Sequence, residues 1–195
     1  MPRRSEARVD ILHEGYVDDI GGELHVGSTV TLIIDGDAMI VVDPGMVADR
    51  AALVGTLKAH GPEQLELTNV VFSHHHPDHT VNAAPFPAAR IHDHYATCHG
   101  DRWVDTDAEP DELSPSVRLL RTPGHSAEDV TTVASAADGV DACTHASWGE
   151  HGPADDPYPR DRDALRAARE RILGFAAVII PGHGPAFRSD NRTPR

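Results

Sequence analysis

Histidines are concentrated in one short segment of this chain, which has fourteen histidines among its 195 residues. Residues 73–79 read SHHHPDH and directly follow a short apolar stretch. In a loop held in a fixed bend, alternate side chains point the same way, so His74 and His76 can hold one cation. Asp78 and His79 then turn toward a second position. Zn²⁺ and similar metals prefer imidazole and carboxylate ligands, so the segment predicts a metal site. The alternative is a polar surface loop that happens to be rich in histidine.

Two further histidines occupy Pro-Gly-His turns. His125 lies in TPGHS (122–126) and His183 in PGHGP (181–185), each directly after an apolar stretch that we predict to be a strand. Proline fixes the strand exit and glycine permits a tight backbone, so each turn offers a rigid histidine at the same kind of sheet edge. A single histidine there is usually structural or exposed. Three histidine-bearing strand ends in one chain favour metal binding.

The elements that would position these residues follow from the hydrophobic pattern. Helical periodicity predicts helices over 49–60 and 161–173. The 93–116 segment is polar and lacks apolar periodicity, which predicts loops and a short helix around 94–99. This order of elements suggests two sheets with helices on their outer faces. Runs rich in Val, Ile and Thr predict strands over 11–20, 24–35, 38–43, 69–73, 117–121, 129–135, 140–144 and 176–180.

Length and composition restrict the class of protein. We expect one domain over 1–195, with 39% hydrophobic and 25% charged residues typical of a folded globular chain. A formal net charge of −14 would repel a polyanion, so we expect no nucleic-acid partner. No apolar run approaches the roughly 18 residues of a membrane span, and two cysteines are too few for a disulfide framework. We therefore expect a soluble, cytoplasmic protein with no membrane partner.

The residues above make the sequence similar to the metallo-β-lactamase superfamily over 29–187. The resemblance implies an α/β fold, a four-layer αββα sandwich of two mixed sheets with helices outside and metals at one sheet edge. Within the superfamily, the sequence is most similar to the group of metallo-β-lactamase domain-containing protein 1, through its short spacings, residues 82–86 and the ending 181–187. The match is carried by the His-x-His-x-Asp-His motif, two later histidine motifs and a strand-end aspartate, namely His74, His76, Asp78, His79, His125, His183 and Asp43.

The resemblance also implies a role for each of these residues. Zinc is the expected metal, as one or two ions, with iron or manganese possible. The metal-bound hydroxide would be the nucleophile, and Asp78 would both ligate a metal and orient that hydroxide. His75 is expected to be exposed rather than functional. The first metal would be held by His74, His76 and His125, and the second by Asp78, His79 and His183.

Asp43 follows a predicted strand and precedes Pro44. Metal-ligating histidines usually donate their second ring N–H to a fixed acceptor. We therefore expect Asp43 to accept a hydrogen bond from a ligand histidine or from a nearby backbone N–H. The alternative is a turn residue with no role at the site.

The sequence departs from the superfamily pattern at one place. A Gly-Asp pair, whose aspartate bridges the two metals, is expected between the His125 and His183 motifs. The corresponding stretch 142–148 reads ACTHASW and contains no aspartate. Ungapped alignment puts Ala146 at the aspartate position, and a one-residue shift would make His145 a ligand instead of a solvent-facing residue. Without the bridging carboxylate, two dications repel each other more strongly, so we expect the second metal to bind more weakly.

Three function classes are compatible with these residues. The leading hypothesis is a metal-dependent hydrolase of a small-molecule ester, thioester, lactone, amide or phosphoester, with a homodimer as a possible assembly. The second is a mononuclear iron enzyme similar to persulfide dioxygenases, which a weakened second site would suit. The third is a non-catalytic metal-binding protein. Fold-level resemblance does not choose the substrate.

Restoring the missing carboxylate should strengthen the second metal site. We expect Ala146→Asp to tighten the second metal, because a negative charge between two cations reduces their repulsion. His145→Ala should weaken the same metal if His145 is a ligand. Titration with Zn²⁺ in a chelator buffer measures both effects. Two equally tight sites in the unmodified protein would contradict the electrostatic argument.

Overall fold

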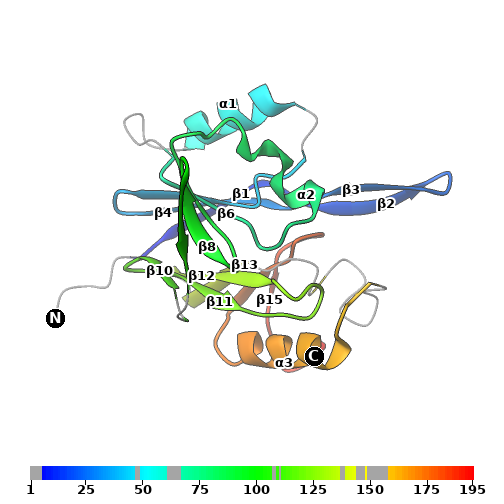
Figure 1. Ribbon diagram of the computed structural model, residues 1–195. Coiled ribbons are helices and arrows are strands. Elements are labelled where there is room, and N and C mark those ends of the chain that lie inside the picture. Colours follow the sequence, from blue (N-terminus) through cyan, green and yellow to red (C-terminus); the bar gives the residue numbers. More distant parts are fainter. Residues whose placement is uncertain are drawn as a thin grey trace.

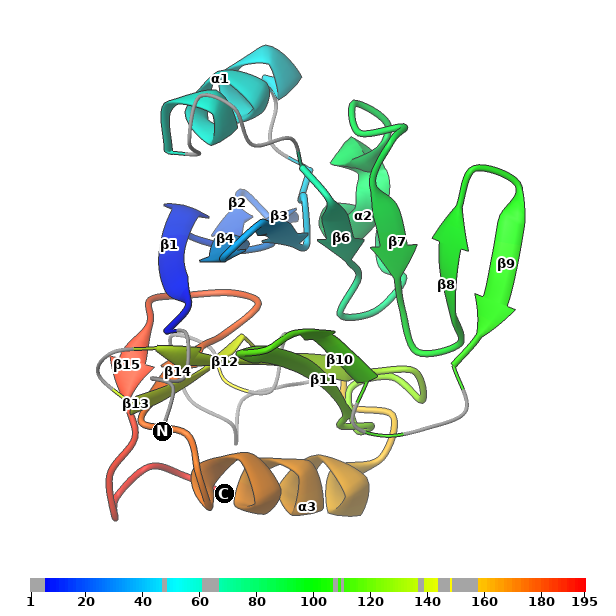
Figure 2. The same cartoon turned by 90° about the vertical axis from the view of Figure 1, so that its left-hand side faces the viewer.

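Two β-sheets lie face to face, with α1 (Arg50–His60) outside one and α3 (Arg162–Leu173) outside the other (Figure 1; Figure 2). This computed structural model describes residues 6–46, 49–60, 67–106, 109, 111–136, 139–143, 148 and 158–195. The expected four-layer αββα sandwich is confirmed. Among the described residues, no helix is long and apolar enough to cross a membrane.

The first sheet leads to the histidine-rich loop. Its strands lie in the order β1-β4-β5-β6-β7-β8-β9, with β6 parallel to both β5 and β7 and the other neighbours antiparallel. The central strands read as near-continuous apolar runs because both faces are covered. The bounds are β1 Arg8–His13, β4 Val30–Asp35, β5 Ala38–Val42, β6 Asn69–Val71, β7 Arg90–His92, β8 Ala96–His99 and β9 Arg102–Asp105.

The second sheet leads to both Pro-Gly-His turns. Its order is β10-β11-β12-β13-β14-β15, antiparallel except for the β13–β14 pair, so both sheets are mixed as predicted. The turn with His125 follows β11, and the turn with His183 follows β14. The bounds are β10 Asp111–Ser114, β11 Val117–Arg121, β12 Val130–Ala136, β13 Gly139–Cys143, β14 Val178–Ile180 and β15 Phe187–Arg188.

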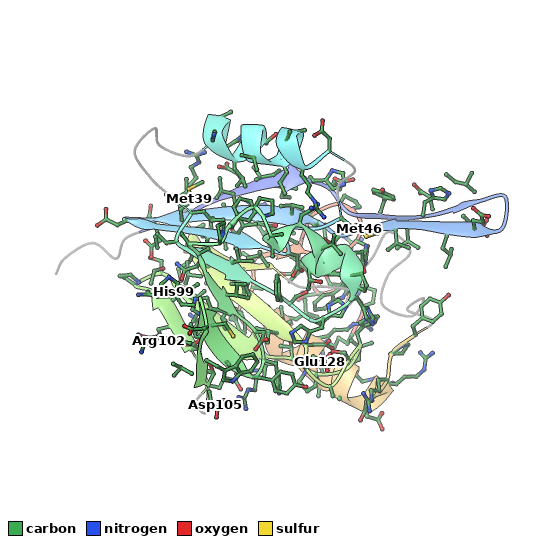
Figure 3. The ribbon with its side chains drawn as sticks, turned by 45° about the horizontal axis from the view of Figure 1, so that its top comes forward. Met39, Met46, His99, Arg102, Asp105 and Glu128 are labelled. Carbon is green, nitrogen blue, oxygen red and sulfur yellow. The ribbon has the colours of Figure 1, made fainter. Side chains whose placement is uncertain are left out.

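The apolar core is divided among the layers. Between the sheets, Ile40 and Val71 belong to the same buried cluster as Leu119. On the outer face of the first sheet, Leu53 of α1 packs in a cluster with Met39, which Figure 3 labels beneath the helix. The helix on the other side, α3, begins at a side-chain cap and buries its own apolar face. Burial of the apolar faces of both helices therefore stabilises the two sheets, and the loops that follow their strands carry the histidines.

The segment 93–116 contradicts its prediction. It forms β8, β9 and β10 instead of loops and a short helix around 94–99. β8 and β9 make a hairpin at the edge of the first sheet, and every residue of β9 is exposed. Figure 3 shows His99, Arg102 and Asp105 along this hairpin. A strand with solvent on both faces needs no alternation of apolar and polar residues, so the pattern carries no strand signal.

Two predicted strands are each divided in two, which creates a separate hairpin. Residues 11–20 divide at Gly15 and residues 24–35 divide at 28–29, leaving β2 (Tyr16–Ile20) paired with β3 (Glu23–Gly27). Gly15 bridges Gly184, and a Cβ at Gly15 would lie 2.3 Å from the Gly182 carbonyl oxygen. The chain must therefore approach the last histidine turn closely here. Figure 1 shows the hairpin projecting beside the short helix α2 (Pro77–Thr80).

A buried carboxylate also joins the two sheets. Asp35, at the end of β4, accepts hydrogen bonds from the Ser114 hydroxyl at 2.7 Å and the Ser116 backbone N–H at 2.8 Å. Asp35 is 3% exposed, whereas Asp37 in the same turn is exposed. Substitution of Asp35 can therefore be compared with substitution of Asp37 as an exposed control.

We expect Asp35→Ala to lower the free energy of unfolding by about 1–3 kcal/mol, because it leaves buried donors without their acceptor. Asp37→Ala should leave it within about 0.5 kcal/mol of the unmodified protein. Denaturant midpoints measure both changes. Equal midpoints for the two variants would show that the hydrogen bonds of Asp35 contribute nothing to the free energy of unfolding.

Candidate metal centre

The histidine-rich loop is held between a buried strand and a short helix. β6 is buried, and the chain turns at Ser73 before α2 starts with Pro77 in its first turn. Proline suits this position because the first helical N–H has no partner within the helix. The His79 backbone N–H donates to the His76 carbonyl at 3.0 Å. The loop therefore presents His74 and His79 inward, at 1% and 0% exposure, and leaves His76 at the surface.

The first group of ligand atoms comprises His74, His76 and His125, as the sequence predicts. His76 Nδ1 lies 2.8 Å from His74 Nε2 and 3.2 Å from His125 Nε2. One ligand atom from each residue lies within 4.8 Å of the other two. Two segments 49 residues apart thus bring three imidazole nitrogens together.

The second group comprises Asp78, His79 and His183, again as predicted, and its ligand atoms also lie within 4.8 Å of one another. Asp78 Oδ2 lies 3.3 Å from His79 Nε2 and 3.5 Å from His183 Nε2. The His74 and His79 rings are in contact, with centroids 4.2 Å apart. The two groups are therefore neighbours at one edge of the sandwich.

The second group favours opposite charges at neutral pH. Burial raises the pKa of the Asp78 carboxyl, but the hydrogen bond and charge of His79 and the charge of His183 lower it to about 2. Burial lowers the pKa of His79, but the carboxylates of Asp43 and Asp78 raise it to about 9. In the metal-free protein, two acidic groups thus stabilise a positive charge at His79. A divalent cation in the same place would gain from the same field.

Asp43 accepts hydrogen bonds from a histidine of the second group and from a nearby backbone N–H, as predicted. Its carboxylate accepts hydrogen bonds from Ser73 N–H at 2.7 Å and the Ser73 hydroxyl at 2.6 Å. It also accepts one from His79 Nδ1 at 2.8 Å. Asp43 is 2% exposed and has φ = 49°, the one positive φ of a non-glycine residue in the described ranges. Such backbone is strained, and it persists where surrounding contacts hold it.

The sequence does not predict the hydrogen-bond partner of the second imidazole nitrogen of His183. His183 Nδ1 lies 3.0 Å from the Gly27 carbonyl oxygen, which can only accept, so Nδ1 must carry the proton. When the ring is neutral, Nε2 therefore carries the lone pair, and this atom lies 3.5 Å from Asp78 Oδ2. Backbone carbonyls leave no trace in residue identity, so no sequence signal predicts this contact.

Two further histidines were named from the sequence, His75 and His145. His75 is exposed as expected, with Nε2 3.1 Å from Asp93 Oδ2 and its ring stacked on Tyr95 at 6.1 Å. His145 lies outside the described residues. Among the described residues, the donor set is five imidazoles and one carboxylate, and the Nδ1 atoms of His79 and His183 already make hydrogen bonds. This chemistry fits zinc or another divalent metal of intermediate softness.

Comparison with known proteins agrees with this arrangement. Residues 25–187 match the metallo-beta-lactamase superfamily. Metallo-beta-lactamase domain-containing protein 1 of Xenopus laevis is 30% identical over 188 residues, covering 92% of this chain and 81% of that protein. The Homo sapiens protein of the same name is 34% identical over 157 residues, covering 76% of this chain. The match spans 59% of the human protein's length, which is less than two thirds.

Solved structures share the fold at low sequence identity. A Thermotoga maritima protein assigned as a metallo-beta-lactamase superposes with a TM-score of 0.74 at 19% identity, covering 94% of this chain and all of that one. A quorum-quenching N-acyl homoserine lactone lactonase has a TM-score of 0.69 at 19% identity and covers 94% of each chain. The protein TTHA1623, in a di-iron-bound form, has a TM-score of 0.60 at 20% identity, covering 89% and 94%. With its two ligand groups at the sandwich edge and 163 matching residues, 25 through 187, the chain belongs to the metallo-β-lactamase superfamily.

Proposed function

We propose that this protein is a metal-dependent hydrolase of a small molecule containing an ester, thioester, lactone, amide or phosphoester bond. The observation that carries the proposal is the presence of two three-residue ligand groups side by side at one sheet edge. The lactonase with the same fold supports hydrolysis as the reaction class. The net charge of −14 supports a small substrate over a nucleic acid.

In this proposal, His74, His76 and His125 hold one metal, and Asp78, His79 and His183 hold a second. The metals would supply Lewis-acid activation of water and of the substrate oxygen under attack. Zinc suits the donor set, and iron or manganese would also be accepted.

The protein's own groups then have separate tasks. Asp78 is ionised at any pH well above 2, so its carboxylate can only accept hydrogen bonds. It can therefore orient a water molecule by accepting a hydrogen bond from one of its O–H groups, and we assign it this catalytic role. Asp43 and the Gly27 carbonyl keep protons on Nδ1 of His79 and His183, which directs both Nε2 lone pairs toward the metal position.

A mononuclear iron oxygenase is the second candidate. The motivating observation is the absence of an aspartate from the stretch 142–148, which reduces the negative charge available to a second metal. The first group alone, three imidazoles with His76 at the surface, would suffice for one iron.

Metal analysis combined with a substrate panel tests the proposed function. We expect up to two zinc ions per chain, and turnover of at least one of an ester, a thioester, a lactone, an amide and a phosphodiester. His125→Ala should reduce that turnover at least a hundredfold, whereas His60→Ala, at an exposed histidine of α1, should not. One iron per chain with oxygen consumption would favour the oxygenase. Metal without turnover on any substrate would indicate a non-catalytic metal-binding protein.

Asp43→Asn should weaken metal binding by about tenfold to a hundredfold. An amide has one oxygen and an NH₂ group, so it cannot accept all the hydrogen bonds that Asp43 accepts from Ser73 and His79. Its NH₂ can also donate to Nδ1 and force the proton of His79 onto Nε2. Zn²⁺ titration measures the loss, with Asp37→Asn as the charge-matched control. Identical curves for both variants would leave Asp43 as a turn residue only.

Metal binding at the second group should release a proton and strengthen as the pH rises. The pKa of His79 is raised to about 9 in the metal-free protein, and a metal ligand must be neutral. Below pH 9, affinity should therefore increase about tenfold per pH unit, and above it the dependence should disappear. Asp78 adds no dependence in this range because its pKa is about 2. Calorimetry in buffers of different ionisation enthalpy counts the protons, and constant affinity from pH 7 to pH 9 would contradict the assignment.

A further inference from the structure

The loop that carries His125 is closed at its base by backbone hydrogen bonds. The Thr122 N–H donates to the Asp129 carbonyl at 2.8 Å, so residues 122–129 form a loop with a narrow neck. The next residue, Val130, donates its N–H to the Ser73 carbonyl at 2.8 Å. The base of this loop is thereby attached to the residue that precedes His74.

Inside the loop, one side chain fixes the backbone next to His125. Asp129 is 0% exposed, and its two carboxylate oxygens lie 2.9 and 2.8 Å from the Ser126 backbone nitrogen. The Ser126 hydroxyl also donates to this carboxylate. Ser126 is the immediate neighbour of His125, and its carbonyl accepts the Gly124 N–H at 2.9 Å. Ser126 therefore links both residues flanking His125, while the Gly124 and His125 carbonyls accept the Asp161 and Arg160 N–H groups at 2.9 and 3.2 Å.

We propose that Asp129 is the positioning residue for the first metal group, acting on His125 through Ser126 without touching the metal. The inference rests on the proposed function only in requiring that the group binds a metal. A carboxylate suits this task because it accepts from the Ser126 N–H and hydroxyl at once and donates nothing. Hydrogen bonds to a carboxylate are of the stronger, charge-assisted kind, so they can hold this partly exposed loop in place.

Asp129 and Asp43 contact different parts of the two metal groups. Asp43 contacts His79 of the second group and Ser73 beside the first, so its loss should affect both groups. The Asp129 carboxylate accepts the Ser126 backbone N–H and hydroxyl, and Ser126 lies in the His125 loop of the first group. Because these contacts lie beside His125, we expect loss of the Asp129 carboxylate to act on the first group.

Zn²⁺ titration in a chelator buffer, followed for each group, tests the proposal without an activity assay. His125→Ala and His183→Ala identify the binding step that belongs to each group. We expect Asp129→Asn to weaken the step that His125→Ala removes by about tenfold and to leave the other unchanged. Glu128→Gln is the matched control, because it removes a carboxylate from the adjacent residue, which Figure 3 labels.

Ser126→Ala keeps the proposal testable if Asp129→Asn does not fold. It removes the hydroxyl donor and leaves the backbone bonds to Asp129, so we expect a smaller weakening at the same step. Equal weakening of both steps, or none in either variant, would overturn the positioning role while leaving the proposed function intact. An unmodified protein that binds no Zn²⁺ would overturn both proposals.

Discussion

The site depends on one buried carboxylate, that of Asp43. It sits at the end of β5 with a positive φ and accepts hydrogen bonds from both the backbone and side chain of Ser73 and from His79. These bonds connect β5 to the loop that follows β6, so the two parallel strands deliver their ends to the same point. Asparagine and aspartate tolerate left-handed backbone better than most residues, which explains how a side chain needed for charge can occupy this conformation.

The same carboxylate shapes the electrostatics of the second ligand group. With Asp78, it makes a positive charge favourable at a fully buried histidine, where burial alone would make it unfavourable. A proton on His79 Nε2 and a metal at the same atom therefore compete, because the same two carboxylates stabilise either positive charge. The protein is in this sense prepared for a cation, because the negative groups are already desolvated and oriented before any ion arrives.

Much of the fold and most of the ligand set could be predicted from residue types. The central strands and both helices have strong hydrophobic patterns, and histidines directly after apolar strands must meet where the strands end. The residue pattern does not predict the β8–β9 hairpin, because every residue of β9 is exposed and β8 is only four residues long. Asp129 was placed at the start of a predicted strand, and nothing in its identity showed that it accepts from Ser126. The Gly27 carbonyl contact depends on tertiary geometry alone.

The attachment of His183 to a backbone carbonyl of the β2–β3 hairpin has an evolutionary consequence. A side-chain partner can be lost by a single base change, but every amino acid supplies a carbonyl at position 27. Point substitutions elsewhere in the hairpin thus leave this acceptor in place, and the exposed side chains of Val17, Ile20 and Leu24 are free to diversify, whereas a Cβ at Gly27 itself would lie 2.8 Å from Tyr16 Cε1. Insertions and deletions are different, because they shift which carbonyl faces the imidazole. The hairpin can vary readily in composition, whereas its length and register are tied to the ligand at the far end of the chain.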